Sequence, residues 1–250
     1  MKIRLIRNAS LKLDINGRTI LIDPYFAPKH SLESFAGKSL NPLVELPVSI
    51  DEILEGVELV LVSHLHSDHF DELAKTMVPK HLPLICQPGD EETIRAAGFE
   101  NVTPLTDSME WNGITFTREE GSHGLGPVVD DMGPVMGVTI EAAGEPRLYW
   151  AGDTVFYPVI AENISSIHPD IIVIHACGAK WDGDLIVMDA DQAIATCEAA
   201  PSAIVVATHM EALDHATTTR EDLRKRADEA GLDRNRLVIP ADGETLTFAG

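Results

Sequence analysis

The feature that most constrains this chain is the segment SHLHSDHFD, which begins where the apolar run ELVLVS ends. Six residues of it contain three histidines and one aspartate: His64, His66, Asp68 and His69. His64 and His66 are two positions apart, so in an extended chain their imidazoles lie on one side and can bind the same ion. A turn then lets Asp68 and His69 face a neighbouring ion. Separately solvated histidines in a polar loop are the alternative, but an ordered quartet at a strand end favours a metal site.

The pattern around this segment predicts strands of two kinds. Antiparallel hairpins are expected at Asn16-Gly17 and Asn112-Gly113, because two-residue turns of this type need positive φ at both positions. Antiparallel hairpins are also expected at the turns around Gly144 and Asp242-Gly243. Three nearly unbroken apolar runs predict strands covered on both faces, at residues 58–63, 170–176 and 203–208.

Capping residues predict helices between these strands. The expected helix starts are Asp90, Asp189, and Thr219 with Asp222 as a capping box. Strands of both kinds with helices on their outer faces indicate an α/β fold of sheets packed on each other and covered by helices. We find no low-complexity linker, so we expect one domain over residues 1–250. The loop at residues 27–49 is long for a compact fold and is expected to line or cover a site.

Three more residues of the metal-ligand type follow predicted strands. His123 lies in GSHG after ITFT, Asp153 in AGDT after RLYW, and His209 in ATHM after IVVA. Taken alone, each fits a structural role, and AGDT fits an ordinary turn. Their shared position at strand ends indicates a common edge where all of them meet the first cluster.

The combination of HLHSDH, an isolated His123, the Asp of GDT and a late His209 resembles the metallo-β-lactamase superfamily of metal-dependent hydrolases. The opening RNASLKLDINGRTILIDPYF is similar to the first hairpin of the branch that contains ascorbate-6-phosphate lactonase. The resemblance covers nearly the whole chain. It implies a four-layered αββα sandwich with two mixed sheets, built from two similar halves.

The resemblance also implies a ligand set for two ions. His64, His66 and His123 would bind the first metal, Asp68, His69 and His209 the second, and Asp153 would bridge them. His215 competes with His209 as a ligand or contacts substrate, and we choose His209 because it directly follows an apolar strand. Relatives often carry histidine where Asn8 stands. Asp23 either accepts a hydrogen bond from a metal-bound histidine or caps a turn before Pro24.

Two divalent ions that share a water lower its pKa and present hydroxide to an electrophilic carbon or phosphorus. We therefore expect a hydrolase of small esters, lactones or phosphoesters with two zinc ions, or manganese in their place. Asp68 would orient the hydroxide, and Asp68, His175 or His215 would protonate the leaving group. A backbone-bonded structural role is favoured for His175. The segment around Trp181 either lines a pocket or is a solvated loop.

The charge balance bears on partners and on competing functions. Nineteen basic and 40 acidic side chains give a formal net charge of −21, which disfavours binding to nucleic acid or to an anionic membrane. A ribonuclease or phosphodiesterase of the same fold is thus a secondary hypothesis. A di-iron redox protein is another, although such relatives usually need a flavin domain for which this chain leaves no room. A non-catalytic, metal-stabilised ligand sensor is the third.

Cellular context is predicted from cysteines and hydropathy. The three cysteines, Cys86, Cys177 and Cys197, are odd in number and widely spaced, which is typical of reduced thiols. The amino terminus lacks the apolar core of a signal peptide. We therefore expect a cytoplasmic enzyme that acts on a small molecule, and homo-oligomers are common among relatives.

Overall fold

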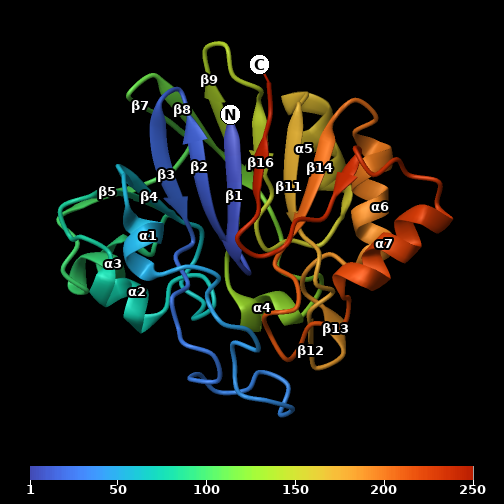
Figure 1. Cartoon of the computed structure of the whole chain (residues 1–250), viewed down its shortest axis with the longest axis horizontal. Coiled ribbons are helices and arrows are strands. Elements are labelled where there is room, and N and C mark those ends of the chain that lie inside the picture. The colour runs from blue at the N-terminus through green and yellow to red at the C-terminus, as the bar shows by residue number, and fades with distance from the viewer. Residues whose placement is uncertain (250) are drawn as a thin grey trace.

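Two seven-stranded sheets pack face to face in the computed structural model, which describes residues 1–249 (Figure 1). The first sheet has the order β16-β1-β2-β3-β4-β5-β6. Its strands are β1 (Lys2–Arg7), β2 (Ser10–Ile15), β3 (Arg18–Ile22), β4 (Leu59–Val62), β5 (Pro83–Cys86), β6 (Asn101–Pro104) and β16 (Thr245–Thr247). Antiparallel pairing joins β16 through β3, and parallel pairing joins β3 through β6.

The second sheet repeats this mixture of antiparallel and parallel pairs. Its order is β15-β14-β11-β10-β9-β8-β7. The strands are β7 (Ser108–Trp111), β8 (Ile114–Glu120), β9 (Met136–Ala142), β10 (Leu148–Trp150), β11 (Ile171–His175), β14 (Ile204–Thr208) and β15 (Leu237–Val238). A separate two-stranded hairpin consists of β12 (Lys180–Trp181) and β13 (Asp184–Leu185).

Three of the four predicted hairpins are confirmed. Asn16 and Gly17 have φ of 50° and 69° between β2 and β3, and Asn112 and Gly113 have φ of 51° and 77° between β7 and β8. The turn with Gly144 joins β9 to β10. Positive φ at both turn residues matches the twist of the flanking strands, which is why these dipeptides mark the turns.

The hairpin expected at Asp242-Gly243 is wrong. The strand after it, β16, is antiparallel, but it pairs with β1 in the first sheet while β15 pairs with β14 in the second. The chain crosses between sheets here because β1 offers an open edge and the partly buried Leu246 and Phe248 pack against the core between the sheets. The Asp-Gly sequence predicts only that the chain reverses here. Which strand β16 pairs with depends on where its apolar side chains are buried.

Alternate residues of the central strands face opposite layers. In β4, Leu59 and Leu61 face the core between the sheets, whereas Val60 and Val62 face the outer helices. The strand β11 divides its isoleucines and valine in the same way. Burial on both faces explains the unbroken apolar runs, and the prediction that these strands are covered on both faces is confirmed. They pair in parallel, β4 with β3 and β11 with β14.

Helices cover the outer face of each sheet and complete the predicted four-layered αββα sandwich (Figure 1). The helices are α1 (Ile50–Leu54), α2 (Glu72–Met77), α3 (Glu91–Ala96), α4 (Val128–Met132), α5 (Pro158–Ile167), α6 (Ala190–Ala199) and α7 (Arg220–Glu229). Residues of α1, α2 and α3 pack on the first sheet, and residues of α5, α6 and α7 pack on the second. Among residues 1–249, no helix is long and apolar enough to span a membrane.

The predicted caps are confirmed for two of three helices. Thr219 and Asp222 form the expected capping box of α7, and the Asp189 side chain accepts from the N–H of Gln192 at the start of α6. Asp90 precedes α3 but makes no side-chain cap bond, because its own backbone is already helical with φ of −90° and ψ of −14°. An N-cap residue needs an extended backbone to turn its side chain onto the free N–H groups.

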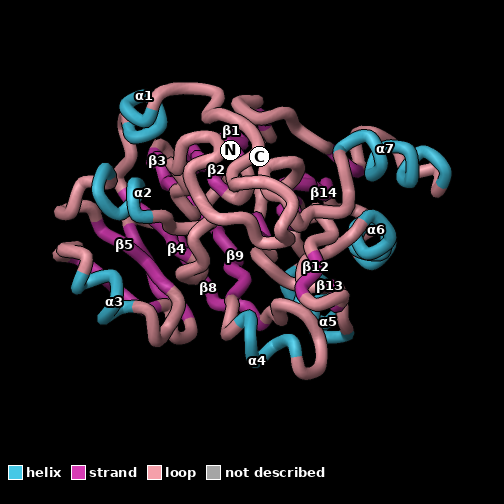
Figure 2. Tube along the Cα trace, turned by 90° about the horizontal axis from the view of Figure 1, so that it is seen from below, coloured by secondary structure: helices cyan, strands magenta, loops and turns pink. Residues whose placement is uncertain are grey.

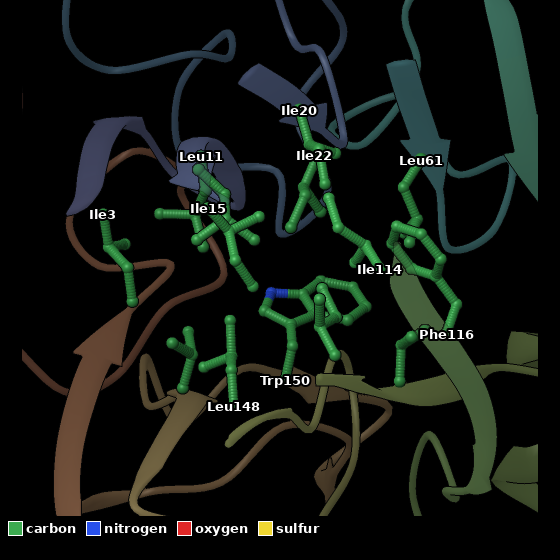
Figure 3. Packing of buried hydrophobic residues seen from close by; sticks show 14 of the residues in the cluster. Ile3, Leu11, Ile15, Ile20, Ile22, Leu61, Ile114, Phe116, Leu148 and Trp150 are labelled. Carbon is green, nitrogen blue, oxygen red and sulfur yellow. The ribbon is translucent and has the colours of Figure 1, made fainter. Parts of the chain in front are cut away.

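The core between the sheets is built from large apolar side chains of both sheets (Figure 3). Trp150 of β10 and Phe116 of β8 are fully buried there and lie opposite Ile22 and Leu61 of the first sheet. This packing fixes the position of one sheet relative to the other. The loops that follow the strands lie together at one edge, which Figure 2 shows between α1 to α3 on one side and α5 to α7 on the other.

We expect Phe116→Ala to lower the free energy of unfolding by about 3–5 kcal/mol, because it removes a fully buried aromatic ring and leaves a cavity between the sheets. Urea unfolding at matched metal content measures the change. The control is Met77→Ala, where the side chain is 39% exposed and the expected change is within about 0.5 kcal/mol. Equal effects of the two substitutions would contradict this account of the core.

Candidate metal centre

Seven strand ends bring polar side chains to one edge of the sandwich. These strands all run in the same direction within their sheets, so their carboxyl ends coincide. The residues are Asn8 after β1, Asp23 after β3, His64 after β4, His123 after β8, Asp153 after β10, His175 at the end of β11 and His209 after β14. The common edge predicted for the ligand candidates is present.

Two groups of ligand-type side chains form at this edge. One comprises His64, His66, His123 and Asp153, and the other His69, Asp153, His175 and His209; the ligand atoms within each group lie within 4.8 Å of one another. Asp153 belongs to both. The two groups are thus joined by a single carboxylate, the position in which a bridging ligand would lie.

Distances place Asp153 at the centre of the imidazoles. Its Oδ2 lies 3.1 Å from Nε2 of His69, 3.3 Å from Nε2 of His123 and 3.8 Å from Nε2 of His64. Its Oδ1 lies 3.7 Å from Nε2 of His209. Side chains from both sheets therefore surround one buried carboxylate.

Asp68 lies beside the second group. Its Oδ2 is 3.1 Å from Nε2 of His209 and 3.6 Å from Nε2 of His69. The amide of Asn8 donates to the same oxygen at 3.2 Å and to the Asp68 backbone carbonyl at 3.1 Å. Asn8, whose role the sequence leaves open, thus fixes the Asp68 carboxylate. It has φ of 58°, a conformation that asparagine adopts more readily than most residues.

Outer hydrogen bonds orient the histidines. Nδ1 of His123 donates to the carbonyl of Ile186 at 2.8 Å, and Nδ1 of His209 lies 3.4 Å from Sγ of Cys177. Nδ1 of His64 lies 2.9 Å from Oγ of Ser63. Each contact leaves Nε2 facing the centre, which is how partners outside a metal site select the tautomer of a ligating histidine.

Asp23 makes the contact predicted for an outer acceptor. Its Oδ2 accepts from Nδ1 of His69 at 2.8 Å, while Ser63 donates to it from Oγ and to Oδ1 from the backbone N–H, both at 2.7 Å. Asp23 is fully buried with φ of 45°. Ser63 therefore links Asp23 to His64, and one carboxylate orients histidines of both groups.

The expectation that His175 is bonded to backbone is wrong. Its Nδ1 lies 2.6 Å from Oδ1 of Asp153, and its Nε2 is buried with no hydrogen-bond partner among residues 1–249. His175 ends an apolar strand, as the other ligand candidates follow theirs, so the strand-end signal would have found it. The side chain either orients Asp153 or joins the second ligand group.

The electrostatics of the site favour positive charge. Burial opposes ionisation of Asp153, but the surrounding histidines, His69 first among them, hold the pKa of its carboxyl well below the ordinary value. Burial also opposes protonation of His69, yet Asp153, Asp68 and Asp23 raise its pKa to about 10. Buried carboxylates in this arrangement need cations, and metal ions meet that need by displacing protons from imidazole.

The donor set fits divalent metal ions. Imidazole nitrogens predominate, with carboxylates in the minority, which is the ligand chemistry of zinc and also accepts manganese. The buried Nε2 of His64 has no hydrogen-bond partner in the described part of the chain. A buried nitrogen without a partner is costly unless it binds something, so this atom supports a ligand role.

A cavity of about 240 Å³ opens onto both ligand groups through His66, Asp68, His123 and Asp153. Its remaining lining comes from four apolar residues and three polar ones: Phe35, Met132, Trp181, Ile186, Ser67, Asp131 and His215. Two segments therefore line the site: the loop at residues 27–49 and the segment around Trp181. For both, lining a pocket is one of the two predicted alternatives. A cavity of this size takes a small molecule.

His215 lies at the cavity and belongs to neither ligand group. Its ring packs edge-on against Phe35, with ring centroids 5.1 Å apart. Burial lowers the pKa of His215, so its neutral form predominates at neutral pH. A neutral imidazole accepts a proton more readily than it donates one, which favours a role as base or hydrogen-bond partner over that of proton donor.

Comparison with known proteins agrees with this geometry. The family described as "Beta-lactamase superfamily domain" matches residues 18–210. The chain is similar to the UPF0173 protein YddR of Bacillus subtilis, with 38% identity over 99% of this chain and 100% of that protein. The particular closeness to ascorbate-6-phosphate lactonase stays a prediction.

Two solved structures are similar over their whole length. One is a "possible metal-dependent hydrolase" from Veillonella parvula, with 36% identity and a TM-score of 0.95 over 99% of both chains. The other is isothiocyanate hydrolase from Delia radicum gut bacteria, with 33% identity and a TM-score of 0.92 over 100% of this chain and 99% of that one.

Substitution of His175 tests whether it orients Asp153 or binds metal itself. We expect His175→Ala to weaken metal binding about 10–100-fold, because Asp153 loses the donor that orients it. Asparagine can place an amide N–H near the position of Nδ1, so His175→Asn should retain most of the affinity. Elemental analysis after dialysis against buffered zinc measures both. Equal loss in the two variants would instead assign His175 as a ligand.

Proposed function

Because the chain belongs to the beta-lactamase superfamily and is a metal-dependent hydrolase, we propose that it hydrolyses a small, uncharged ester or lactone. The observation that carries this proposal is the cavity. It adjoins both ligand groups, and within residues 1–249 no lysine or arginine lines it. The acidic side chain of Asp131 is part of its wall.

We assign the ligand residues as the resemblance to the metallo-β-lactamase superfamily implies them. His64, His66 and His123 would hold one ion, Asp68, His69 and His209 would hold the other, and Asp153 would serve both. Zinc is the first choice and manganese the second. When bound, two such ions supply a water of lowered pKa and stabilise developing negative charge. Both sheets contribute ligands, so we propose that residues 1–250 form a single metallo-hydrolase domain.

The side chains around the ions direct the reaction. Asp68 lines the cavity and is fixed by Asn8, so it can accept a hydrogen bond from an attacking water and orient it toward the substrate carbon. His215 faces the same space with a neutral ring and can accept a hydrogen bond from the attacking water or form one with the bound substrate. The apolar wall excludes bulk water and binds the hydrocarbon part of a substrate.

The charge of the cavity ranks the substrates. A phosphoester brings at least one negative charge, and sites that bind phosphate usually place arginine, lysine or a helix amino terminus beside it. Here the additional charged wall residue is Asp131, and the chain as a whole carries a net charge of −21. Uncharged esters and lactones therefore fit better than phosphoesters.

An isothiocyanate is the second candidate substrate. The similarity to isothiocyanate hydrolase, at 33% identity over the whole chain, favours it. An isothiocyanate is a small, uncharged molecule with an electrophilic carbon, so it meets the same requirements of size and charge as a small ester. Phenethyl isothiocyanate, followed by loss of its ultraviolet absorption, tests this candidate beside the esters.

Removal of metal should abolish the activity. We expect treatment with 1,10-phenanthroline followed by dialysis to lower the hydrolysis of phenyl acetate by more than about 100-fold, since the side chains alone supply no activated water. Added zinc or manganese should restore the rate. Elemental analysis of the same samples should show about two ions per chain when activity is full. Undiminished hydrolysis by the metal-free protein would contradict the proposal.

The charge of the substrate should matter as much as its size. We expect kcat/KM for phenyl acetate to exceed that for monophenyl succinate, which carries a carboxylate, by at least about tenfold. Asp131→Asn should narrow this difference about threefold by removing a like charge from the cavity wall. Its neighbour Asp130 is exposed and does not line the cavity, so Asp130→Asn is the matched control. No preference for the neutral ester would refute the charge argument.

A further inference from the structure

One stretch of the loop between β3 and α1 forms part of the cavity wall without regular secondary structure. It comprises residues 34–41, which we call the wall segment, and it places Phe35 in the cavity. The ring of Phe35 meets His215 at an interplanar angle of 86°. Ordinary loops of this length are mobile, so something must hold the ring at this place.

The side chain of Asp214 supplies that hold. Its carboxylate accepts from the backbone N–H groups of Phe35 at 2.9 Å, Ala36 at 3.2 Å, Lys38 at 3.1 Å and Ser39 at 3.3 Å. The hydroxyl of Ser34 and the amide of Asn41, the latter at 3.1 Å, donate to it as well. The backbone N–H of Asp214 returns a hydrogen bond of 2.9 Å to the side-chain oxygen of Asn41.

Both carboxylate oxygens are needed for this arrangement. Oδ1 accepts from Phe35, Ala36 and Asn41, and Oδ2 accepts from Ser34, Ala36, Lys38 and Ser39. Asparagine at this position has one oxygen and one NH₂ group. Whichever way its amide is turned, the NH₂ group would face N–H donors and could not accept from them. Hydrogen bonds to a charged acceptor are also the stronger kind. The wall segment therefore depends on a carboxylate, and asparagine of the same shape cannot replace it.

The anchor and the metal centre share one stretch of chain. Asp214 precedes His215, which touches Phe35, and both lie within six residues of the ligand candidate His209. The wall segment is thus fastened to the same loop that brings a ligand to the second group. Displacement of the segment would move Phe35 away from the space between Trp181, Met132 and the ions' ligands.

We propose that Asp214 is a positioning residue that sets substrate selectivity by holding Phe35 against His215, and that the substrate carries an aromatic or similarly flat apolar group beside its reacting carbon. The aromatic preference follows from the wall itself, because the aromatic residues Phe35 and Trp181 line the same cavity. This inference rests on the proposed hydrolase function for its kinetic test and stands on the hydrogen-bond network for its structural test.

The kinetic test is a double-mutant cycle with phenyl acetate and methyl acetate on the zinc-loaded protein. Phe35→Ala and Asp214→Asn should each raise KM for phenyl acetate about tenfold, leave its kcat within about twofold and change methyl acetate little. If Asp214 acts through Phe35, Asp214→Asn in the Phe35→Ala background should raise KM less than about twofold. Additive effects, or equal effects on both esters, would overturn the proposal.

The structural test does not depend on activity. Lys38 is exposed, and its own N–H donates to Asp214 and to Oγ of Ser34, a hydroxyl that itself donates to Asp214. Trypsin should therefore cut after Lys38 at least about tenfold faster in the zinc-loaded Asp214→Asn variant. Asp170→Asn is the control, because Asp170 also accepts a backbone N–H, that of Arg147, at the opposite end of β11. An unchanged cleavage rate in Asp214→Asn would overturn the anchor.

Two further measurements distinguish misfolding of the variant, failure of the proposed function and failure of the anchor. Metal content and thermal unfolding show whether Asp214→Asn folds. If it does not, Ser34→Ala removes one donor to Asp214 together with one acceptor of the Lys38 N–H, and should accelerate the same cleavage about threefold. If neither ester is hydrolysed, the proposed function fails on its own account. Faster cleavage after Lys38 would then still support the anchor, and unchanged cleavage would refute it.

Discussion

The site depends on one buried carboxylate. Asp153 lies between imidazoles supplied by both sheets, with its two oxygens 2.6–3.8 Å from nitrogens of five histidines. A carboxylate without cations would be strongly disfavoured at such depth, and so would converging imidazole nitrogens without a shared ligand. The carboxylate and the imidazoles can be buried together because positive charge between them offsets the cost of burying both. The sandwich brings them together because its equivalent strands end at one edge.

The ligand groups show why the sheets must be so well packed. Each outer hydrogen bond lies on one side of the sandwich: Asp23, after β3, orients His69 directly and His64 through Ser63, while the carbonyl of Ile186, between β11 and α6, orients His123. The ligand groups instead combine both sheets, so a shift of one sheet on the other would move His64 and His69 away from Asp153. The dense core around Trp150 therefore serves the chemistry by fixing distances at the edge.

Much of this arrangement is encoded locally and could be predicted. The hairpin dipeptides, the apolar runs and the clustered histidines each reflect a constraint that acts within a few residues. The partner of β16, the role of Asn8 and the hydrogen bond from His175 to Asp153 could not be predicted in the same way, because they join segments far apart in sequence. Asp90 is a different case, since its sequence fits a cap and its backbone angle prevents one.

Asp214 marks the limit of prediction more clearly than any ligand does. Nothing in the sequence around it distinguishes this aspartate from the other acidic residues of a strongly acidic chain. Its importance comes from the wall segment, about 175 residues earlier. Without Asp214, the backbone N–H groups of Phe35, Ala36 and Ser39 would lack an acceptor within residues 1–249, and that of Lys38 would keep only Oγ of Ser34. A segment outside helices and sheets lacks backbone carbonyls to accept from its N–H groups, so side chains must accept these hydrogen bonds instead. The loop that shapes the cavity is thus stable for the same reason as the metal centre: a buried carboxylate gathers donors from distant parts of the chain.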